Sequence, residues 1–355
     1  MPVQDKSVAV ITPVFNGEPY LYDCIQSVLN QTHRNFDYFI ADNCSTDRSL
    51  EIAQAAARSD KRIKVIEAGE HLGPIQNWNR SLMNVESGHD YIKFVHADDW
   101  IYPQCISSLM AVAESDARVG VVSSYRLEED RVSLDRLPAD APLVPGVDTL
   151  TMDGRSVARA VLLERASVLG SPTSTLLRAS SIDKPGEYFT TEFLHADKEA
   201  CLRSLLECDF GFVRQVLAYT RRHNESVTSL TNSLDTRRQE NLLFLKMYGP
   251  KLLSDSEYQF AWNRELRDYY QFLAENLGAS KSDAFWQSHK EILSKAGAGF
   301  SKARLFRTFI RGWANPGIAS RVLRRNSATS KGADDSKTHG FLDLSRTGHS
   351  SKDDR

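Results

Sequence analysis

The chain has 355 residues, of which 41% are hydrophobic and 25% charged, with a formal net charge of −2. This length predicts one domain of about 220 to 250 residues with a C-terminal addition, and the near-neutral charge argues against nucleic-acid binding. The five cysteines form no CxxC pair, which favours reduced, intracellular thiols over disulfides or a zinc site. Without a long apolar stretch or a signal-peptide pattern, neither secretion nor a membrane span is expected.

Two strand–loop–helix units are predicted in the first 60 residues. Ser7 to Thr12 is a β-branched run that ends at Pro13, and apolar residues then recur at helical spacing from Tyr20 to Gln31. This pattern is typical of a buried parallel strand followed by a helix. Phe36 to Ala41 and a helix from Asp47 to Ser59 repeat it. The loop after the first strand matches neither GxGxxG nor GxxxxGK, which removes the main sequence support for a dehydrogenase or a P-loop NTPase.

Asp42 directly follows the second of these strands. Ligands of open α/β sheets bind in the crevice beyond the carboxyl ends of the strands. The Asp42 carboxylate is therefore placed to accept a hydrogen bond from a nucleobase N–H or a ribose hydroxyl. The alternative is an Asx-turn, in which the carboxylate serves only the local backbone.

The functional prediction depends most on the stretch after the third strand, Ile63 to Glu67. Tyr91 to Val95 is an apolar strand, and the adjacent carboxylates of Asp98 and Asp99 follow it. Adjacent carboxylates repel each other and are costly to desolvate, so a cation, a hydroxyl donor or water must sit against them. A ligand site is the leading interpretation, and a solvated turn that caps the next helix is the alternative.

The chain then continues to alternate between helix and strand. A helix opened by Pro103 precedes a fifth strand from Val119 to Ser123, and the pattern so far predicts a doubly wound α/β fold. Arg126 to Val147 is charged and without a period. This segment predicts a long loop of the kind that covers active sites.

Candidate residues for catalysis and phosphate binding follow this loop. Asp197 falls in the first turn of a predicted helix and is the candidate general base, with Glu192 as the second choice. The alternative role for Asp197 is an N-cap or helix-dipole aspartate. A strand from Phe210 to Thr220 ends in Arg221 and His223. These cations suit a diphosphate or form a solvated surface cluster.

The last third of the chain changes character twice. Residues 233–295 show amphipathic helical patterns, which we expect to pack against the catalytic domain. Residues 300–325 contain seven basic and no acidic residues, interleaved with apolar ones at helical spacing. Such a helix suits an anionic membrane surface, or it docks on an acidic face of the same fold. Residues 326–355 have little to bury and are predicted to be disordered.

Together these residues suit a nucleoside diphosphate sugar. Asp42 would hold the base, Asp98 the ribose and Asp99 a divalent ion that bridges the phosphates, because magnesium-like ions take one or two carboxylates plus substrate phosphates. The ion would neutralise the departing diphosphate, and Asp197 would deprotonate the acceptor hydroxyl. Trp100 is a candidate for shaping the acceptor site, with simple packing as the alternative.

Three segments agree in order and spacing with one known family: VAVITPVFNGEPYLYDCIQSVLNQTHRNFDYFIADNCSTD, HLGPIQNWN and KFVHADDW. They resemble glycosyltransferase family 2, the inverting GT-A enzymes, over roughly residues 7–228. The resemblance implies an α/β GT-A fold, a Rossmann-like doubly wound and mostly parallel sheet with a C-terminal helical extension. The expected domains are a GT-A catalytic domain at 1–228, a helical extension at 229–299, a basic amphipathic segment at 300–325 and a tail at 326–355.

The resemblance also implies roles for individual residues. Those implied to line the nucleoside pocket are Thr12, Pro13 and Asp42. Asp98 and Asp99 are implied to form a DXD-type element for the nucleotide and a divalent metal, Mn²⁺ or Mg²⁺, and Asp197 to be the base. Two positions depart from the family pattern: His96 stands where many members have another Asp, and Ala196 stands where a Glu is common.

The sequence therefore predicts an inverting, metal-dependent transferase that moves one sugar from a nucleoside diphosphate sugar to a hydroxyl of a saccharide or lipid-linked acceptor, in cell-surface polysaccharide or glycoconjugate synthesis. The lack of a Q-x-x-R-W motif favours single transfer over polymerisation. The expected location is cytoplasmic, with contact to an anionic membrane through residues 300–325 as a hypothesis. The alternatives are a sugar nucleotidyltransferase, which usually has a Gly-rich basic loop after its first strand, and a non-catalytic nucleotide-sugar-binding protein.

Overall fold

The structure, a computed structural model, describes residues 5–128, 131–133, 136–142, 146–221, 236–277 and 282–313. The chain forms two compact units. The first comprises Met1–Leu266 and Ser288–Gly299, and the second comprises Arg267–Gln287 and Phe300–Arg355. The sheet and the predicted site residues that are described belong to the first unit.

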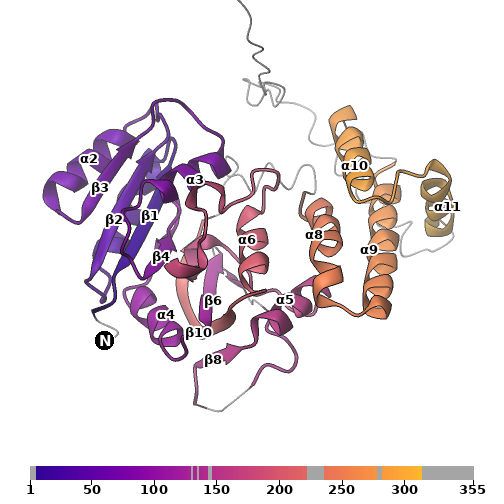
Figure 1. Cartoon of the computed structure of the whole chain (residues 1–355). Coiled ribbons are helices and arrows are strands. Elements are labelled where there is room, and N and C mark those ends of the chain that lie inside the picture. Colours follow the sequence, from indigo (N-terminus) through magenta and orange to yellow (C-terminus); the bar gives the residue numbers. More distant parts are fainter. Residues whose placement is uncertain are drawn as a thin grey trace, which may run out of the picture. The chain divides into compact units, whose positions relative to one another are not determined.

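A mixed sheet in the order β3-β2-β1-β4-β9-β6-β10-β5 forms the centre of the first unit. Its strands are β1 (Val8–Val14), β2 (Phe36–Asp42), β3 (Ile63–Glu67), β4 (Tyr91–Phe94), β5 (Trp100–Ile101), β6 (Val119–Glu128), β9 (Thr175–Arg178) and β10 (Asp209–Thr220). Strands β3, β2, β1 and β4 run parallel, as do β6 and β10, while β9 is antiparallel to β4 and β6. The predicted doubly wound, mostly parallel α/β fold is confirmed (Figure 1).

Helices pack on both faces of this sheet because its central strands are apolar on both sides. The helices up to the end of the sheet are α1 (Glu18–Leu29), α2 (Ser49–Ser59), α3 (Pro74–Met83), α4 (Cys105–Ala113), α5 (Gly154–Leu162) and α6 (Ala196–Ser204). On one face, Val10 of β1 shares a core cluster with Leu21 of α1 and Leu109 of α4. On the other face, Trp78 of α3 packs on Phe94 of β4, with ring centroids 6.4 Å apart.

The first strand extends two residues beyond its predicted last residue, Thr12, and includes Pro13. The backbone of Ile11, two residues before Pro13, faces β4, because the Ile11 carbonyl accepts the Val95 N–H at 2.9 Å. The backbone of Pro13 also faces the side of β4, but the pairing of β1 with β4 ends at the pair Ile11 and Phe94. The N–H that proline lacks would therefore have had no strand partner, and β1 continues to Val14 beside β2.

The prediction of a continuous loop from Arg126 to Val147 is wrong at its start. Strand β6 continues to Glu128, and β7 (Arg131–Ser133) pairs with it. Arg126 and Glu128 lie on the same face of β6 and form an ion pair, with a guanidinium nitrogen 2.8 Å from a carboxylate oxygen. A charged sequence is therefore compatible with a strand here. A further strand, β8 (Thr149–Met152), pairs with β10.

The predicted C-terminal helices are present as α8 (Thr236–Leu252), α9 (Asp255–Glu275), α10 (Asp283–Lys295) and α11 (Lys302–Trp313). Helix α8 packs against α5, and Leu163, Leu245 and Ala261 belong to one buried apolar cluster there. Within the described ranges, no helix has the length and apolar character needed to cross a bilayer. The predicted disordered tail at 326–355 lies outside the described residues, and the predicted domain boundaries stay predictions.

Candidate active site

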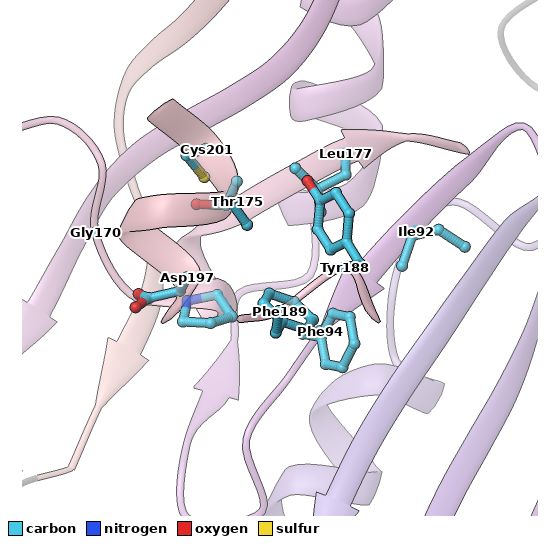
Figure 2. A pocket seen from close by; sticks show the side chains of 11 residues that line it. Ile92, Phe94, Gly170, Thr175, Leu177, Tyr188, Phe189, Asp197 and Cys201 are labelled. Atoms are coloured by element: carbon cyan, nitrogen blue, oxygen red, sulfur yellow. The ribbon is translucent and has the colours of Figure 1, made fainter. Parts of the chain in front are cut away.

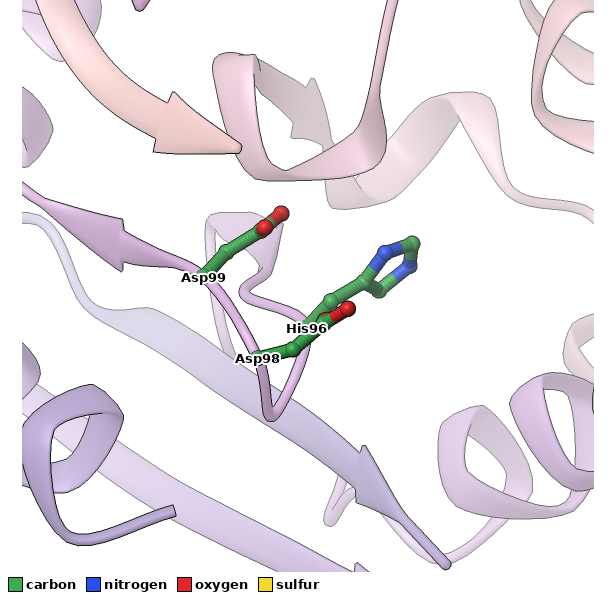
Figure 3. A group of neighbouring side chains, drawn as sticks. All are labelled: His96, Asp98 and Asp99. Atoms are coloured by element: carbon green, nitrogen blue, oxygen red, sulfur yellow. The ribbon is translucent and has the colours of Figure 1, made fainter. Parts of the chain in front are cut away.

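The turn after β4 brings together three side chains that could hold a metal ion. His96, Asp98 and Asp99 each offer one ligand atom, and these atoms lie within 4.8 Å of one another (Figure 3). Nε2 of His96 is buried and has no hydrogen-bond partner. Carboxylate oxygens suit Mg²⁺ and Mn²⁺, and an imidazole nitrogen is a common ligand of transition-metal ions. The donor set therefore fits a divalent ion.

Asp99 is the most buried member of this group, with 2% of its surface exposed. Its Oδ2 accepts a hydrogen bond from the Thr173 hydroxyl at 2.6 Å, and its Oδ1 accepts one from the Arg221 backbone N–H at 3.0 Å. Burial, together with the charge of Asp98, raises the pKa of Asp99 to about 8. The buried carboxylate is thus costly to ionise alone, and a cation beside it would favour the ionised form.

Arg221 is fixed beside the two carboxylates at the end of β10. Its guanidinium lies 4.4 Å from the centroid of the Tyr20 ring and 5.4 Å from that of Trp100, and its Nε donates to the Asp98 carbonyl at 3.2 Å. Trp100 in turn stacks on Tyr219 at 3.7 Å. The Trp100 indole therefore packs against Arg221, the predicted phosphate-binding residue. A contact between Trp100 and an acceptor stays a prediction.

Lys93 supports the site from within the sheet, a role that the sequence analysis missed. Its side chain is fully buried, and its Nζ donates to the carbonyls of Pro172 at 3.4 Å, Thr175 at 3.1 Å and Thr173. Burial lowers the pKa of Lys93 to about 8. The short helix η2 (Pro172–Ser174) is thereby fastened to β4, and it is this helix that presents the Thr173 hydroxyl to the acidic pair.

We expect Lys93→Met to lower the free energy of unfolding by about 2–4 kcal/mol, because it leaves buried carbonyls without a donor. Urea unfolding followed by tryptophan fluorescence measures the change. Lys61→Met is the matched control, since Lys61 is exposed and surface substitutions usually change stability by less than about 0.5 kcal/mol. Equal stability of the two variants would contradict the supporting role of Lys93.

Asp42 uses one carboxylate oxygen for a local turn, and its predicted contact with a nucleobase or ribose stays a prediction. Its Oδ2 accepts the Ser45 N–H at 3.0 Å, which is the local turn. Its Oδ1 is buried and has no hydrogen-bond partner. The backbone at Asp42 is also held by Arg80, whose guanidinium donates to the Asp42 carbonyl at 3.1 Å. One oxygen thus holds the loop, and the other is an acceptor without a donor.

The remaining predicted nucleoside residues are part of the core. Thr12 is fully buried, and its hydroxyl lies 2.9 Å from that of Tyr38. Pro13 is buried within β1. Their role in nucleoside binding stays a prediction, and His223 lies outside the described residues.

Asp197 lies half-buried in the first turn of α6, as predicted. Burial raises the pKa of Asp197. Its side chain borders a cavity of about 20 Å³ whose lining also includes Pro172, Phe94 and Tyr188, and Figure 2 shows the carboxylate at the end of the cavity away from the aromatic rings. Glu192, the second candidate, is exposed.

Helix α8 holds the segment that leads into Asp197. The buried carboxylate of Glu240 accepts the backbone N–H of Leu194 at 2.7 Å and that of His195 at 3.0 Å, and it also contacts His195 Nδ1 at 2.7 Å. Burial opposes protonation of His195, but the hydrogen bond to Glu240 and the charges of Glu240 and Asp197 together outweigh it and raise the pKa of His195. Lys198 of α6 reaches Asn241 of α8 at 2.8 Å. The start of α6 is therefore anchored by α8.

The structure brings most of the predicted residues to one end of the sheet. Asp98, Asp99 and Arg221 are in direct contact. Asp197 interacts electrostatically with His96 and lines the same cavity as Pro172 of η2, whose neighbour Thr173 bonds to Asp99. Asp42 ends β2, which runs parallel to β1 and β4, so its carboxylate lies at the same edge.

Comparison with known proteins identifies a family for the N-terminal part of the chain. Residues 9–182 match the family described as Glycosyl transferase family 2. This part of the chain belongs to glycosyltransferase family 2. Glycosyltransferase GlyA of Streptococcus pneumoniae serotype 4 is 35% identical over 126 residues, which are 35% of this chain and 18% of GlyA. TuaG of Bacillus subtilis (strain 168), whose name refers to teichuronic acid biosynthesis, is 30% identical over 130 residues, 36% of this chain and 51% of TuaG. The matches thus span about half or less of these relatives.

Solved structures share the fold of this family 2 chain. TarS residues 1–349 of S. aureus in complex with UDP-GlcNAc superposes with a TM-score of 0.61 and 16% identity, covering 92% of each chain. The mannosyltransferase PcManGT of Pyrobaculum calidifontis in complex with GDP-Man and Mn²⁺ gives a TM-score of 0.51 and 13% identity, covering 90% of this chain and 86% of that one. At these identities the comparison establishes the GT-A fold.

Proposed function

We propose that this family 2 chain transfers one sugar from a nucleoside diphosphate sugar to an acceptor hydroxyl with inversion, in the synthesis of a cell-surface polysaccharide or glycoconjugate. The observation that carries the proposal is the η2 helix. Its Pro172 borders the same cavity as Asp197, and its Thr173 bonds to Asp99. These two contacts support a candidate base and a candidate diphosphate site that are linked through one short helix.

The residues have complementary roles in a direct displacement. Asp197 accepts the proton of the acceptor hydroxyl, and its raised pKa brings it closer to the working pH. The free oxygen of Asp42 accepts from a base N–H, Asp98 serves the ribose, and the Arg221 guanidinium contacts the diphosphate. A divalent ion held by Asp99, with Asp98 and His96 beside it, would neutralise the negative charge of the leaving diphosphate.

The comparisons support a nucleotide-sugar donor. TarS was solved with UDP-GlcNAc, and PcManGT with GDP-Man and Mn²⁺. These complexes also motivate the choice of ligands for the test. A thermal-shift panel of UDP, GDP and dTDP, each with and without Mn²⁺, identifies the base and the metal requirement, and nucleoside diphosphate release from the matching sugar then measures turnover.

The same assay separates the alternatives. Release of nucleoside diphosphate from the donor supports transfer, whereas formation of nucleoside triphosphate from pyrophosphate and nucleotide sugar would indicate a nucleotidyltransferase. Binding without any turnover in the presence of saccharide and lipid-linked acceptors would favour a nucleotide-sugar-binding protein. The loop after β1 contains a single glycine, Gly17, and no lysine or arginine, which favours the transferase.

Replacing Asp42 with Ala should weaken binding of the preferred nucleoside diphosphate by about 10- to 100-fold, because a hydrogen bond to a charged acceptor is lost. Isothermal titration calorimetry with that nucleotide measures the change. The matched control is Asp23→Ala, since Asp23 is an exposed carboxylate on α1. If Asp42→Ala bound the nucleotide as the wild type does, the base would lie elsewhere.

A further inference from the structure

Helix α11 presents two neighbouring stripes of different chemistry to solvent. Arg304, Arg307 and Arg311 recur at helical spacing along one side. Phe306 and Ile310 follow next around the helix, and they are 63% and 52% exposed. Exposed large apolar residues beside a row of cations are unusual on a surface that only water contacts.

The arginine stripe borders a hollow of about 320 Å³. Its basic lining residues are Arg267, Arg304, Arg307 and Arg311. Arg304 is held in place, with its guanidinium 4.6 Å from the centroid of the Tyr270 ring. Ser301 fixes the start of the helix, because its N–H donates to the Tyr270 hydroxyl at 2.7 Å. Three of the four cationic groups thus lie on α11, whose start is held by Tyr270, and the fourth lies on α9.

The charges of this stripe are largely uncompensated. Arg267 contacts Asp268 at 3.1 Å. Among the residues that the structure describes, Arg307 and Arg311 have no acidic partner, and α11 itself carries no acidic residue. The chain from Phe300 to Arg325 is free of Asp and Glu throughout. An anion is therefore the complementary ligand for this face.

We propose that this face of α11 docks the protein on an anionic phospholipid surface. Lipid phosphates match the arginine stripe, and the boundary between head groups and acyl chains accommodates Phe306 and Ile310. Inorganic phosphate or a soluble polyanion would satisfy the cations but would leave the two apolar side chains in water. An acceptor carried by such a surface would meet a protein that is already bound to it, which goes beyond the proposed transfer reaction.

The test is cosedimentation of the full-length protein with phosphatidylcholine vesicles, with and without phosphatidylglycerol. We expect binding to the anionic vesicles alone, with a loss as the salt concentration rises. Arg307→Gln with Arg311→Gln lowers the partition coefficient about 30-fold, at about fivefold per cation. The matched control is Arg58→Gln with Lys61→Gln, which removes two exposed cations elsewhere and leaves binding unchanged.

The apolar stripe has its own pair of variants. Phe306→Ser lowers the partition coefficient by about tenfold, whereas Phe260→Ser, at a residue that is 70% exposed on α9, does not. Circular dichroism verifies the fold of each variant. Equal binding to neutral vesicles, or equal loss in the control variants, would overturn the proposal. So would full binding by Phe306→Ser combined with displacement by inorganic phosphate, which would indicate a soluble anion site. Vesicle binding requires no sugar transfer, so the outcome is independent of the proposed function.

Discussion

Replacing Asp197 with Asn is expected to lower kcat of sugar transfer by about 100- to 10,000-fold, the usual contribution of a general base. Asn keeps the size of the side chain but cannot accept the proton of the acceptor hydroxyl. Nucleoside diphosphate binding should stay at the wild-type level, because the acidic pair and Asp42 are untouched. Initial rates of diphosphate release, together with calorimetric titration of the nucleotide, separate the two effects.

The matched control for this variant is Glu192→Gln. Glu192 lies in the same segment but is exposed, and its removal should leave kcat near the wild-type value. Since burial raises the pKa of Asp197, the acidic limb of the wild-type pH–rate profile should lie above the range of an ordinary aspartate. A fully active Asp197→Asn, or an inactive Glu192→Gln, would move the base assignment to another residue.

Asp99→Asn is expected to abolish the effect of Mn²⁺ on nucleotide-sugar binding. The variant loses the most buried carboxylate of the His96, Asp98 and Asp99 group. Even residues that only support a metal ligand contribute about 10- to 100-fold to metal affinity, so a loss of about 100-fold or more is expected for the ligand itself. Titration of Mn²⁺ alone, and of nucleotide with and without Mn²⁺, measures it. Asp140→Asn, at an exposed carboxylate, is the control.

The pH dependence of the same site provides a second readout. Because the pKa of Asp99 is raised to about 8 in the metal-free protein, the folded state holds a proton that the unfolded chain has already released near its usual pKa of about 3.9. Stability from this group is therefore lost as the pH rises through about 8, and Mn²⁺ affinity increases over the same range because fewer protons compete. A Mn²⁺ affinity that is flat between pH 6 and 8, or that Asp99→Asn retains, would contradict the metal assignment.

Local sequence patterns predicted the parallel part of the fold because each strand is a continuous apolar run. They could not predict that β9 inserts antiparallel between β4 and β6, since these pairings join segments that are far apart in the sequence and depend on packing. Asp98 and Asp99 were evident because two carboxylates after a buried strand have no structural need. Asp197 was a candidate from its place in a predicted helix, but the sequence marked it less clearly, because one acidic residue in the first turn of a helix is common.

The residues that support the site differ in how clearly the sequence marks them. Lys93 had a signal, since a lysine within the apolar run of β4 must either reach water or find buried acceptors, and it does the latter. Thr173 lies in a segment of small polar residues, where no local feature marks the hydroxyl that bonds to Asp99. Glu240 is an ordinary residue of an amphipathic pattern, and its partners at Leu194 and His195 lie about 45 positions away.

The anchoring of residues 194 and 195 by Glu240 bears on how this protein can be dissected. The family match ends at residue 182, yet the loop before Asp197 is bonded to α8, which begins at Thr236. A fragment trimmed to the family boundaries would lack Asp197, and one trimmed just before α8 would lose the Glu240 contacts that hold Leu194 and His195 in front of α6. A fragment meant to keep the surroundings of Asp197 as they stand in the structure therefore has to include α8.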